Sequence, residues 1–296
     1  MTYSIVARDP ETGELGVAVQ SHWFAVGPIV PWALSGVGAV ATQANVEVSY
    51  GPRALALMQD GASAPEALER LLSEDSGRAG RQVAVIDAAG QVAVHTGEEC
   101  IAFAGHATGE AVSCQANIMA SESVWPAMLD AYGAGGGSLT MRLLAALDAA
   151  ELEGGDIRGR QSAAILVVPQ TSEPWRSVVS LRVEDHPQPL PELRRLVKLH
   201  EAYALASRGD ELINEARHEE AGEFFQRASA LAPDNHELRF WAGLGLAQAG
   251  EVAAGMEKVR EAIAEHAGWR VLLDRLTPEV APSAQAVRAR LSEESH

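Results

Sequence analysis

The stretch TYSIVARDPETGELGVAVQS, residues 2–21, decides the fold of the first part of the chain. Its two halves, 2–7 and 14–20, are rich in β-branched and small residues, which favour extended strands. The segment 9–13 between them contains a proline and a glycine, which supply turn dihedrals. The stretch therefore predicts a β-hairpin at the start of the sequence.

Groups of strands and groups of helices follow the hairpin. Apolar or alternating runs predict strands at 36–43, 82–87, 91–95, 101–104, 112–118, 162–168 and 177–183. Helices are predicted from Gly51-Pro52-Arg53 onward and at 64–73, 121–132 and 138–152. Short connections imply antiparallel pairing. The element order predicts an α+β fold with two sheets between two helical layers, rather than a doubly wound parallel sheet.

The last third of the chain reads as helix only. Residues 184–191 (EDHPQPLP) carry three prolines and indicate a linker. Beyond them Gly209 and Gly243 are 34 residues apart, as are Ala228 and Ala262, a spacing that resembles the tetratricopeptide repeat. We expect a domain at 1–185, a proline-rich linker at 186–196, and a tetratricopeptide-like helical module at 197–296. Because only about two repeats fit, the module is expected to lean on the first domain or on another subunit of a homodimer.

Composition excludes several classes of partner. The formal net charge of −17 repels nucleic-acid phosphates and anionic lipid. No run of about 18 uncharged apolar residues predicts a membrane span, and no signal peptide is visible. The two cysteines, Cys100 and Cys114, fit a reduced compartment, so we expect a cytoplasmic protein. No cofactor motif and no zinc-ligand spacing is present, so neither cofactor nor metal is expected.

Thr2 is the candidate nucleophile. Methionine is normally removed before a small second residue, which would leave Thr2 with a free α-amine of pKa about 7.7–8.0. That amine is a usable base for its own hydroxyl. Ser21 and His22 follow the second strand and would lie near Thr2 in the hairpin, Ser21 in catalysis and His22 in substrate binding. Ser4 and Ser21 remain alternative nucleophiles.

Substrate-binding groups are expected at the ends of other elements. Gln43 and Asn45 end a buried strand in polar groups, and Arg53 lies at a helix start that favours an anion. The loop GGDIRGRQS, residues 154–162, offers Asp156 for a substrate amine and Arg158 or Arg160 for a carboxylate. The same loop could instead be braced by an ion pair between Asp156 and one of these arginines.

Several blocks together resemble a known family. The stretch TYSIVARDPETGELGVAVQSHWFAVG, the later QVAVIDAAGQVAVHTG with GHATGE, and GGDIRGRQSAAILV are similar to a bacterial Ntn-hydrolase-like family of unknown function. The resemblance covers roughly residues 1–185 and implies an αββα sandwich with Thr2 at the nucleophile position. Proteasome-like members carry a lysine beside the nucleophile, and no residue in 1–197 can match it. Proteasome-type proteolysis is therefore not expected.

The leading expectation is an amidohydrolase that acts on a small, charged amide or peptide-like substrate. Strand-end amides or Asn and Ser side chains would hold the oxyanion. A rival hypothesis is a non-catalytic ligand-binding scaffold whose repeat module recruits a protein partner. A Cys100–His106 pair would be a different nucleophile, but no third orienting group accompanies it in the sequence.

Overall fold

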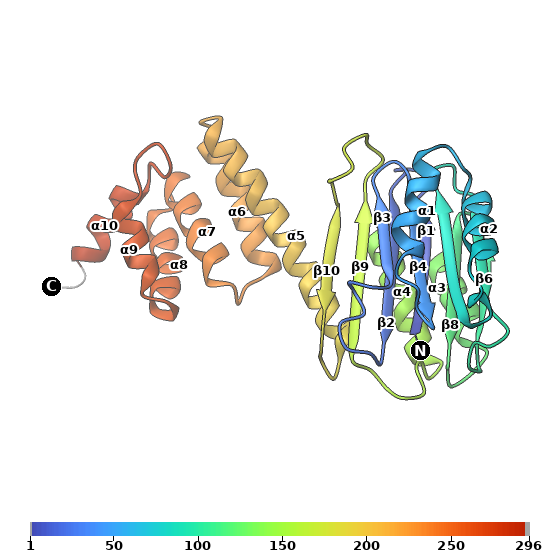
Figure 1. Ribbon diagram of the computed structural model, residues 1–296. Helices are drawn as coiled ribbons and strands as arrows, with labels where there is room; N and C mark the ends of the chain where they lie inside the picture. The colour runs from blue at the N-terminus through green and yellow to red at the C-terminus, as the bar shows by residue number, and fades with distance from the viewer. Residues whose placement is uncertain (1, 294–296) are drawn as a thin grey trace. The chain divides into compact units, whose positions relative to one another are not determined.

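The computed structural model describes residues 2–293 and divides the chain into two compact units, one up to Arg194 and one from Arg195 onward (Figure 1). The strands are β1 Thr2–Arg8, β2 Leu15–Ser21, β3 Pro31–Leu34, β4 Gly38–Ala44, β5 Arg81–Asp87, β6 Val92–Thr96, β7 Gly105–Gly109, β8 Val112–Asn117, β9 Ser162–Val168 and β10 Val179–Val183. The helices are α1 Tyr50–Gln59, α2 Ala64–Glu74, α3 Val124–Ala134, α4 Leu139–Leu152, α5 Pro189–Asn214, α6 His218–Leu231, α7 His236–Gln248, α8 Val252–Glu265, α9 Gly268–Arg275 and α10 Ala284–Glu293. A 3₁₀ turn at Arg78–Gly80 leads into β5.

The strands of the first unit form two antiparallel sheets. The larger has the order β10-β9-β2-β1-β8-β7 and the smaller the order β3-β4-β5-β6. The predicted N-terminal hairpin is confirmed, because β1 pairs with β2 from Thr2 opposite Ser21 to Arg8 opposite Leu15. β1 also pairs with β8, so the start of the chain lies in the middle of the larger sheet.

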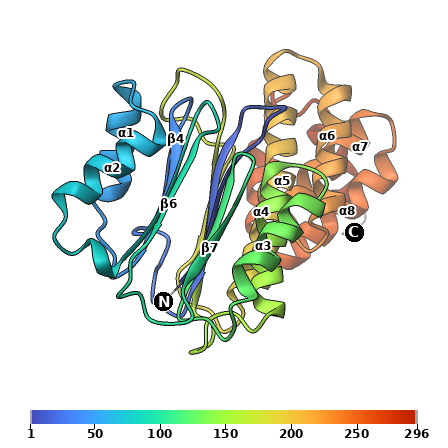
Figure 2. The ribbon, with the colours of Figure 1, turned by 90° about the vertical axis from the view of Figure 1, so that its right-hand side faces the viewer.

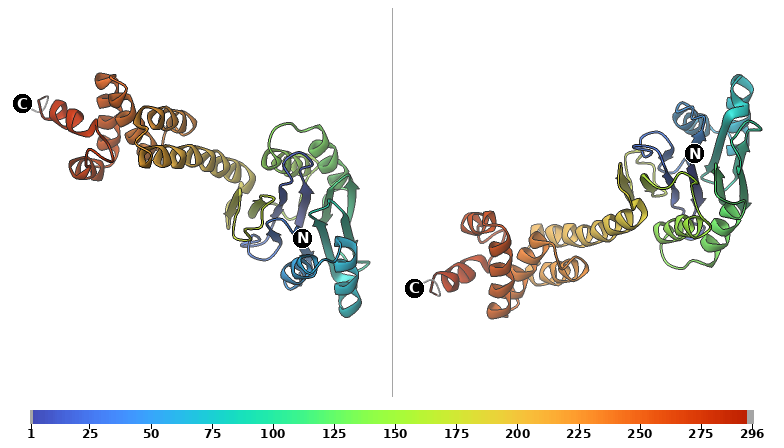
Figure 3. Two further views of the ribbon diagram at one scale, coloured as in Figure 1. Left: turned by 90° about the horizontal axis from the view of Figure 1, so that it is seen from above. Right: turned by 90° about the horizontal axis from the view of Figure 1, so that it is seen from below.

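Helices cover the outer face of each sheet, which gives four layers (Figure 2). Helices α1 and α2 pack on the smaller sheet, and α3 and α4 pack on the larger. Seen from above and below, the blue-cyan pair and the green pair lie on opposite sides of the strands (Figure 3). Gly16 allows α4 to approach β2 closely, since a Cβ atom there would come within 2.6 Å of Leu143.

The alternation of side chains along the strands buries apolar residues on both faces of the smaller sheet. Val6, Val17 and Ile86 belong to a cluster between the two sheets. Val83 and Val85, one position out of phase on β5, instead pack under α1 and α2. Both faces of the central strands β2, β5 and β9 are therefore buried, which explains why the sequences of these strands are largely apolar.

Three predictions need correction. Residues 101–104 form a loop and β7 begins only at Gly105. The strand β3 was not predicted; its first residue is Pro31, which is tolerated at the start of an edge strand. The segment predicted as a linker is helical from Pro189 onward. Prolines are compatible with a first helical turn because the N–H groups there have no intrahelical partner.

The second unit consists of helices. Gly222 of α6 and Gly245 of α7 face each other so closely that a Cβ atom on Gly245 would lie 2.6 Å from the Gly222 backbone. Two apolar clusters run through the unit, one around Phe225 and one around Phe240. Within residues 2–293 no helix combines the length and apolar character needed to cross a membrane.

Candidate functional site

A cavity of about 440 Å³ lies at the end of the sheets where β1 begins, which is the lower end in Figures 1 and 2. At this end β2 and β8 finish, so that Thr2 pairs with Ser21 on one side and Asn117 on the other. Its polar lining residues are Thr2, Ser21, Gln43, Asn45, Glu99, Asn117 and Arg158. The rest of the lining is Trp23, Val26, Ile29, Val30, Ala44, Val46, Gly80, Cys100, Ile101 and Ile118.

Thr2 contributes a hydroxyl to this cavity. Because strand side chains alternate, Thr2 and Ser4 project from β1 toward the smaller sheet while Tyr3 projects toward α4. The Thr2 Oγ1 donates a hydrogen bond of 3.0 Å to the Ser21 Oγ across the strand pair. Both residues are almost wholly buried, so the hydroxyl pair is held in one arrangement.

Two side-chain amides donate hydrogen bonds to the backbone of Thr2. The Nε2 of Gln43 and the Nδ2 of Asn117 both donate to the Thr2 carbonyl oxygen, at 3.2 and 3.4 Å. The same two amide groups also donate to the Oε1 of Gln82, at 2.8 and 2.9 Å. The Gln82 oxygen therefore fixes which way both amides face, and both orient a donor toward Thr2.

Gln82 is the centre of this network. Its Nε2 donates to the Thr96 Oγ1 at 2.9 Å and to the Gly105 and Ala116 carbonyl oxygens at 3.1 and 2.9 Å. Gln82 is fully buried, and each of its polar atoms has a partner. Such a network rigidifies its surroundings because every unpaired member would carry a desolvation penalty.

The predicted residues on the 154–162 loop are divided between two places. Arg158 lines the cavity, and its guanidinium binds the Asp156 carboxylate through contacts of 3.1 and 2.8 Å. The same carboxylate accepts from the backbone N–H of His22 at 3.1 Å. Because Asp156 is buried and held by these contacts, it braces the loop. Arg160 binds Glu151 of α4, which also accepts from the Tyr3 hydroxyl at 2.5 Å.

Burial and the neighbouring Glu151 carboxylate raise the pKa of Tyr3 well above its usual value. The Tyr3 hydroxyl therefore stays protonated and able to donate. The Arg160–Glu151–Tyr3 contacts join the loop, α4 and β1, and none of the three residues lines the cavity. Their geometry is that of a structural tie between layers.

Two other predicted binding residues lie apart from the lining. Arg53 pairs with Glu74 on the surface formed by α1 and α2, where both side chains are exposed. His22 is next to Ser21 but is not a lining residue, and its Nδ1 is buried without a hydrogen-bond partner among residues 2–293. The structure thus brings together Thr2, Ser21, Gln43, Asn45 and Arg158, and leaves Arg53 and Arg160 in ion pairs elsewhere.

Asn117, Gln82 and the apolar wall of the cavity were not predicted from the sequence as parts of the site. Asn117 closes a strand in the way that Gln43 does, so the strand-end pattern was a usable signal. Cys100 lines the cavity, where burial raises the pKa of its thiol. Its Sγ donates to the Arg81 carbonyl oxygen, whereas His106 contacts Thr96, so the two do not form the pair considered from the sequence.

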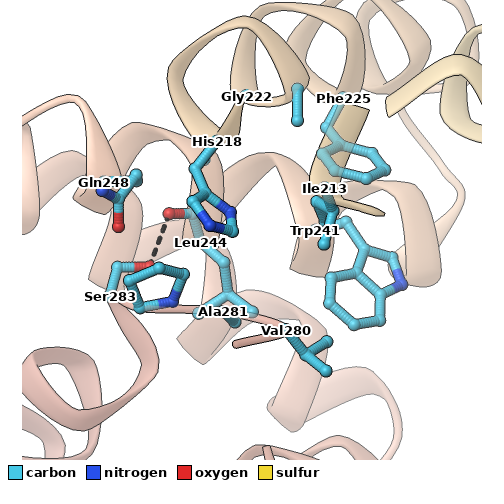
Figure 4. Close-up of a pocket in the computed structure, with 13 residues that line it drawn as sticks. Ile213, His218, Gly222, Phe225, Trp241, Leu244, Gln248, Val280, Ala281 and Ser283 are labelled. Atoms are coloured by element: carbon cyan, nitrogen blue, oxygen red, sulfur yellow. Dashed lines mark hydrogen bonds between the residues drawn. The ribbon is translucent and has the colours of Figure 1, made fainter. Parts of the chain in front are cut away.

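No group of three or more His, Cys, Asp or Glu side chains able to hold a metal ion occurs among the residues that the structure describes. The second unit contains a much smaller pocket, of about 30 Å³. Phe225 and Trp241 lie at one end of it, and His218, Gln248 and Ser283 lie toward the other (Figure 4). The Ser283 hydroxyl is already used, since it donates to the Leu244 carbonyl oxygen at 2.8 Å. The Thr2 cavity is therefore the better candidate for chemistry.

Comparison with known proteins places the first unit in a family. Residues 2–193 match the family of unknown function DUF1028. A crystal structure of protein SPO2555 from Silicibacter pomeroyi, assigned to the same family, is 36% identical and superposes with a TM-score of 0.61. The match covers 67% of this chain and 84% of that one. No curated protein sequence matches the chain. The chain therefore belongs to the family of unknown function DUF1028.

Proposed function

We propose that the first unit is an Ntn-type amidohydrolase in which Thr2 is the nucleophile. The observation that carries the proposal is the hydroxyl of Thr2, at the start of a central strand, in a cavity of about 440 Å³ and 3.0 Å from the Ser21 hydroxyl. A cavity of this size accepts a small organic substrate. The helix–sheet–sheet–helix layering supports the αββα sandwich of the Ntn type.

The chemistry requires that Met1 is removed, so that Thr2 carries a free α-amine; Met1 itself lies outside the described residues. The Thr2 Oγ1 attacks the amide carbonyl carbon, and its proton passes to the α-amine, directly or through water. The tetrahedral intermediate expels the amine, which takes that proton. Water then attacks the resulting ester, releases the carboxylic acid and restores the Thr2 hydroxyl.

Ser21 and Asn45 have supporting roles in this mechanism. The Thr2 hydroxyl already donates to the Ser21 Oγ, so Ser21 orients the nucleophile. Gln43 and Asn117 are committed to the Thr2 carbonyl and to Gln82, so they position the nucleophile rather than bind the substrate. Asn45 lines the cavity from the loop after β4 and is the side chain we assign to the oxyanion.

The alternative nucleophile Ser4 is less suitable. Its Oγ donates to the Gln43 Oε1 at 2.6 Å and accepts from the Gln115 Nε2 at 2.6 Å, so its hydrogen-bonding capacity is used. It is fully buried and does not line the cavity. Attack by Ser4 would require the network to be dismantled, and this favours Thr2.

The decisive experiment compares Thr2→Ala with wild-type protein on neutral aryl amides. We expect hydrolysis to fall by about a thousandfold or more, as for removal of other catalytic nucleophiles. Thr2→Ser should retain activity because it keeps the hydroxyl. Thr108→Ala removes an exposed hydroxyl on β7 and is the matched control. Mass spectrometry of the intact protein must find Met1 removed; retention of Met1 in active protein would rule out the α-amine as base.

We further infer that the second unit is built on tetratricopeptide-like repeats and binds a protein partner. Positions 34 residues apart have matching environments, since Ala228 and Ala262 are both fully buried. Gly209 packs against the Phe225 ring and Gly243 against the Gly255 backbone, so both repeat glycines lie at close contacts. This supports the repeat reading of the spacing. Pull-down with the full chain and with a Trp241→Ala variant would test whether this unit recruits a partner.

A further inference from the structure

The mouth of the Thr2 cavity carries an unusual amount of exposed apolar surface. Trp23, Ile101 and Ile157 are 59%, 62% and 67% exposed, and Phe103 is also exposed. We call these four residues the apolar rim. Large side chains of this kind are scattered singly on most surfaces, and their concentration around one opening indicates a binding site.

The apolar rim lies on three loops, and backbone hydrogen bonds tie two of them to Ile118 and Met119. Ile118, which lines the cavity, donates its N–H to the Ile101 carbonyl oxygen at 3.0 Å and accepts from the Ile157 N–H at 3.3 Å. The next residue, Met119, donates to the Phe103 carbonyl oxygen at 3.1 Å. Loops 101–103 and 156–158 are therefore neighbours on either side of Ile118. The third loop, which carries Trp23, follows directly after Ser21.

The apolar rim is continuous with the inside of the cavity. Trp23 and Ile101 belong to both, and the aliphatic side chains of Val26, Ile29 and Ile118 line the same cavity as Thr2. Apolar residues thus make up most of the lining, and the charged side chains that line the cavity are Glu99 and Arg158. The guanidinium of Arg158 is held by the Asp156 carboxylate, so the cavity presents no strong demand for an anionic substrate group.

We propose that the substrate is an amide whose acyl part is an extended apolar chain, lying along the wall of the cavity with its far end on the apolar rim. This inference rests on the proposed function, because the carbonyl carbon is placed by the Thr2 hydroxyl. It differs from the expectation of a small, charged amide in the chemistry of the acyl part. An acyl chain is the occupant that explains why apolar surface leads to the reacting group, whereas a docking protein would explain only the rim.

The test is a series of straight-chain acyl p-nitroanilides with two, four, six and eight carbons in the acyl group, which keep one neutral leaving amine. We expect kcat/KM to rise with chain length, by up to about fourfold for each methylene that is buried. Binding of the corresponding primary alkanamides to Thr2→Ala, measured by calorimetry, should follow the same order. A flat dependence on chain length in both assays would overturn the inference.

Variants of the apolar rim sharpen the test. Trp23→Ser and Ile101→Ser should flatten the chain-length dependence, with a loss of kcat/KM that grows from the acetyl to the eight-carbon compound. Trp175→Ser is the matched control, because Trp175 is 76% exposed but far from the cavity along the strands. It follows the last residue of β9, whereas the first residue of β9 pairs with Ser21 at the cavity end. Rim variants that keep the full dependence would contradict the inference. The inference would also be contradicted if the wild-type protein is a dimer, the rim variants are monomers, and chain length has no effect on kcat/KM.

The series also separates this inference from the proposed function. If alkanamides bind with increasing affinity but no anilide is hydrolysed, the apolar site stands and the catalytic proposal fails. If Thr2-dependent hydrolysis of the acetyl compound has the same kcat/KM as that of the longer compounds, the catalytic proposal stands and the acyl-chain inference fails.

Discussion

The two ends of the space between the sheets are built by the same strands but from opposite kinds of residue. On β5 the inward side chains run from Gln82 through Ala84 to Ile86, and on β1 they run from Thr2 through Ser4 to Val6. The far end is an ordinary apolar core, whereas the near end is a buried network of amides and hydroxyls. Apolar residues would fill the near end at no hydrogen-bonding cost.

The difference shows where the burial of polar groups serves to hold one group in position rather than to stabilise the fold. A buried polar network adds little net stability, because each bond replaces a bond to water. What it adds is a single orientation, since every donor and acceptor must be satisfied together. The group on which this network converges is the carbonyl of Thr2, the residue whose hydroxyl is the proposed nucleophile. The polar end is therefore interpreted as positioning machinery, and the apolar end as the source of stability.

The largest effect is expected for Gln82→Leu, which inserts an apolar side chain of similar size into the polar end. The Gln43 and Asn117 amides and the Gly105 and Ala116 carbonyl groups would each lose a partner. We expect the free energy of unfolding to fall by about 3 kcal/mol, and anilide hydrolysis to fall as well. Urea unfolding measures the first quantity and kcat the second.

Ile86→Val on the same face of the same strand is the control for that variant. Removal of one methylene from the apolar end should cost about 1 kcal/mol and leave kcat unchanged. If both variants reduced kcat equally, the two ends would not differ in role and the comparison would fail.

A smaller effect is expected for Ser4→Ala. It leaves the Gln43 Oε1 and the Gln115 Nε2 without the hydroxyl that joins them, which should cost about 2 kcal/mol by urea unfolding. Ser113→Ala is the matched control, because the Ser113 hydroxyl donates one hydrogen bond, of 2.8 Å, to the Gln115 Oε1. That variant should cost about 1 kcal/mol. A Ser4→Ala variant as stable as wild type would mean that the network is not satisfied through Ser4.

These residues also mark the boundary of what the sequence predicts. The hairpin and the nearness of Ser21 to Thr2 follow from local pattern, because strand pairing across a short turn sets the register. The contacts of Gln82 with Gln43 and Asn117 join three strands of two different sheets, and no local pattern specifies how the sheets face each other. Gln82 was therefore predicted only as part of a strand.

Arg53 and Arg160 show the same limit of prediction from sequence, because both were predicted to bind the substrate and neither lines the cavity. Charge and loop position made Arg53 and Arg160 plausible ligand-binding groups. Their carboxylate partners, Glu74 and Glu151, lie on helices whose docking the sequence does not specify. Arg158 and Asp156 are two residues apart, so their bracing pair was a foreseeable alternative. Short-range ion pairs are thus predictable in kind, whereas long-range ones require the packed layers.

The smallest effect concerns the outer support of the polar end. Arg81, next to Gln82, donates to the Asn45 carbonyl oxygen at 2.5 Å and binds Asp75 at 2.9 Å, which joins the cavity loop to the segment after α2. The hydrogen bond from the Arg81 guanidinium lowers the pKa of Asp75 in the folded protein. A carboxyl group with a depressed folded pKa stabilises the fold above its unfolded pKa of about 3.9, and this contribution is lost as the pH falls through the folded value.

Asp75→Asn should therefore lower the free energy of unfolding by less than about 1 kcal/mol at pH 7, since the pair is partly solvated. Asn can still accept from the Gly77 N–H, but it cannot accept from both Arg81 and Gly77, so the difference reports the ion pair together with its hydrogen bond. Urea unfolding of both proteins from pH 7 downward should find the difference shrinking below pH about 4, as wild-type Asp75 becomes protonated. A difference that grows on acidification would mean that Asp75 is destabilised by its surroundings, and Arg81 would then hold the Asn45 loop without help from this carboxylate.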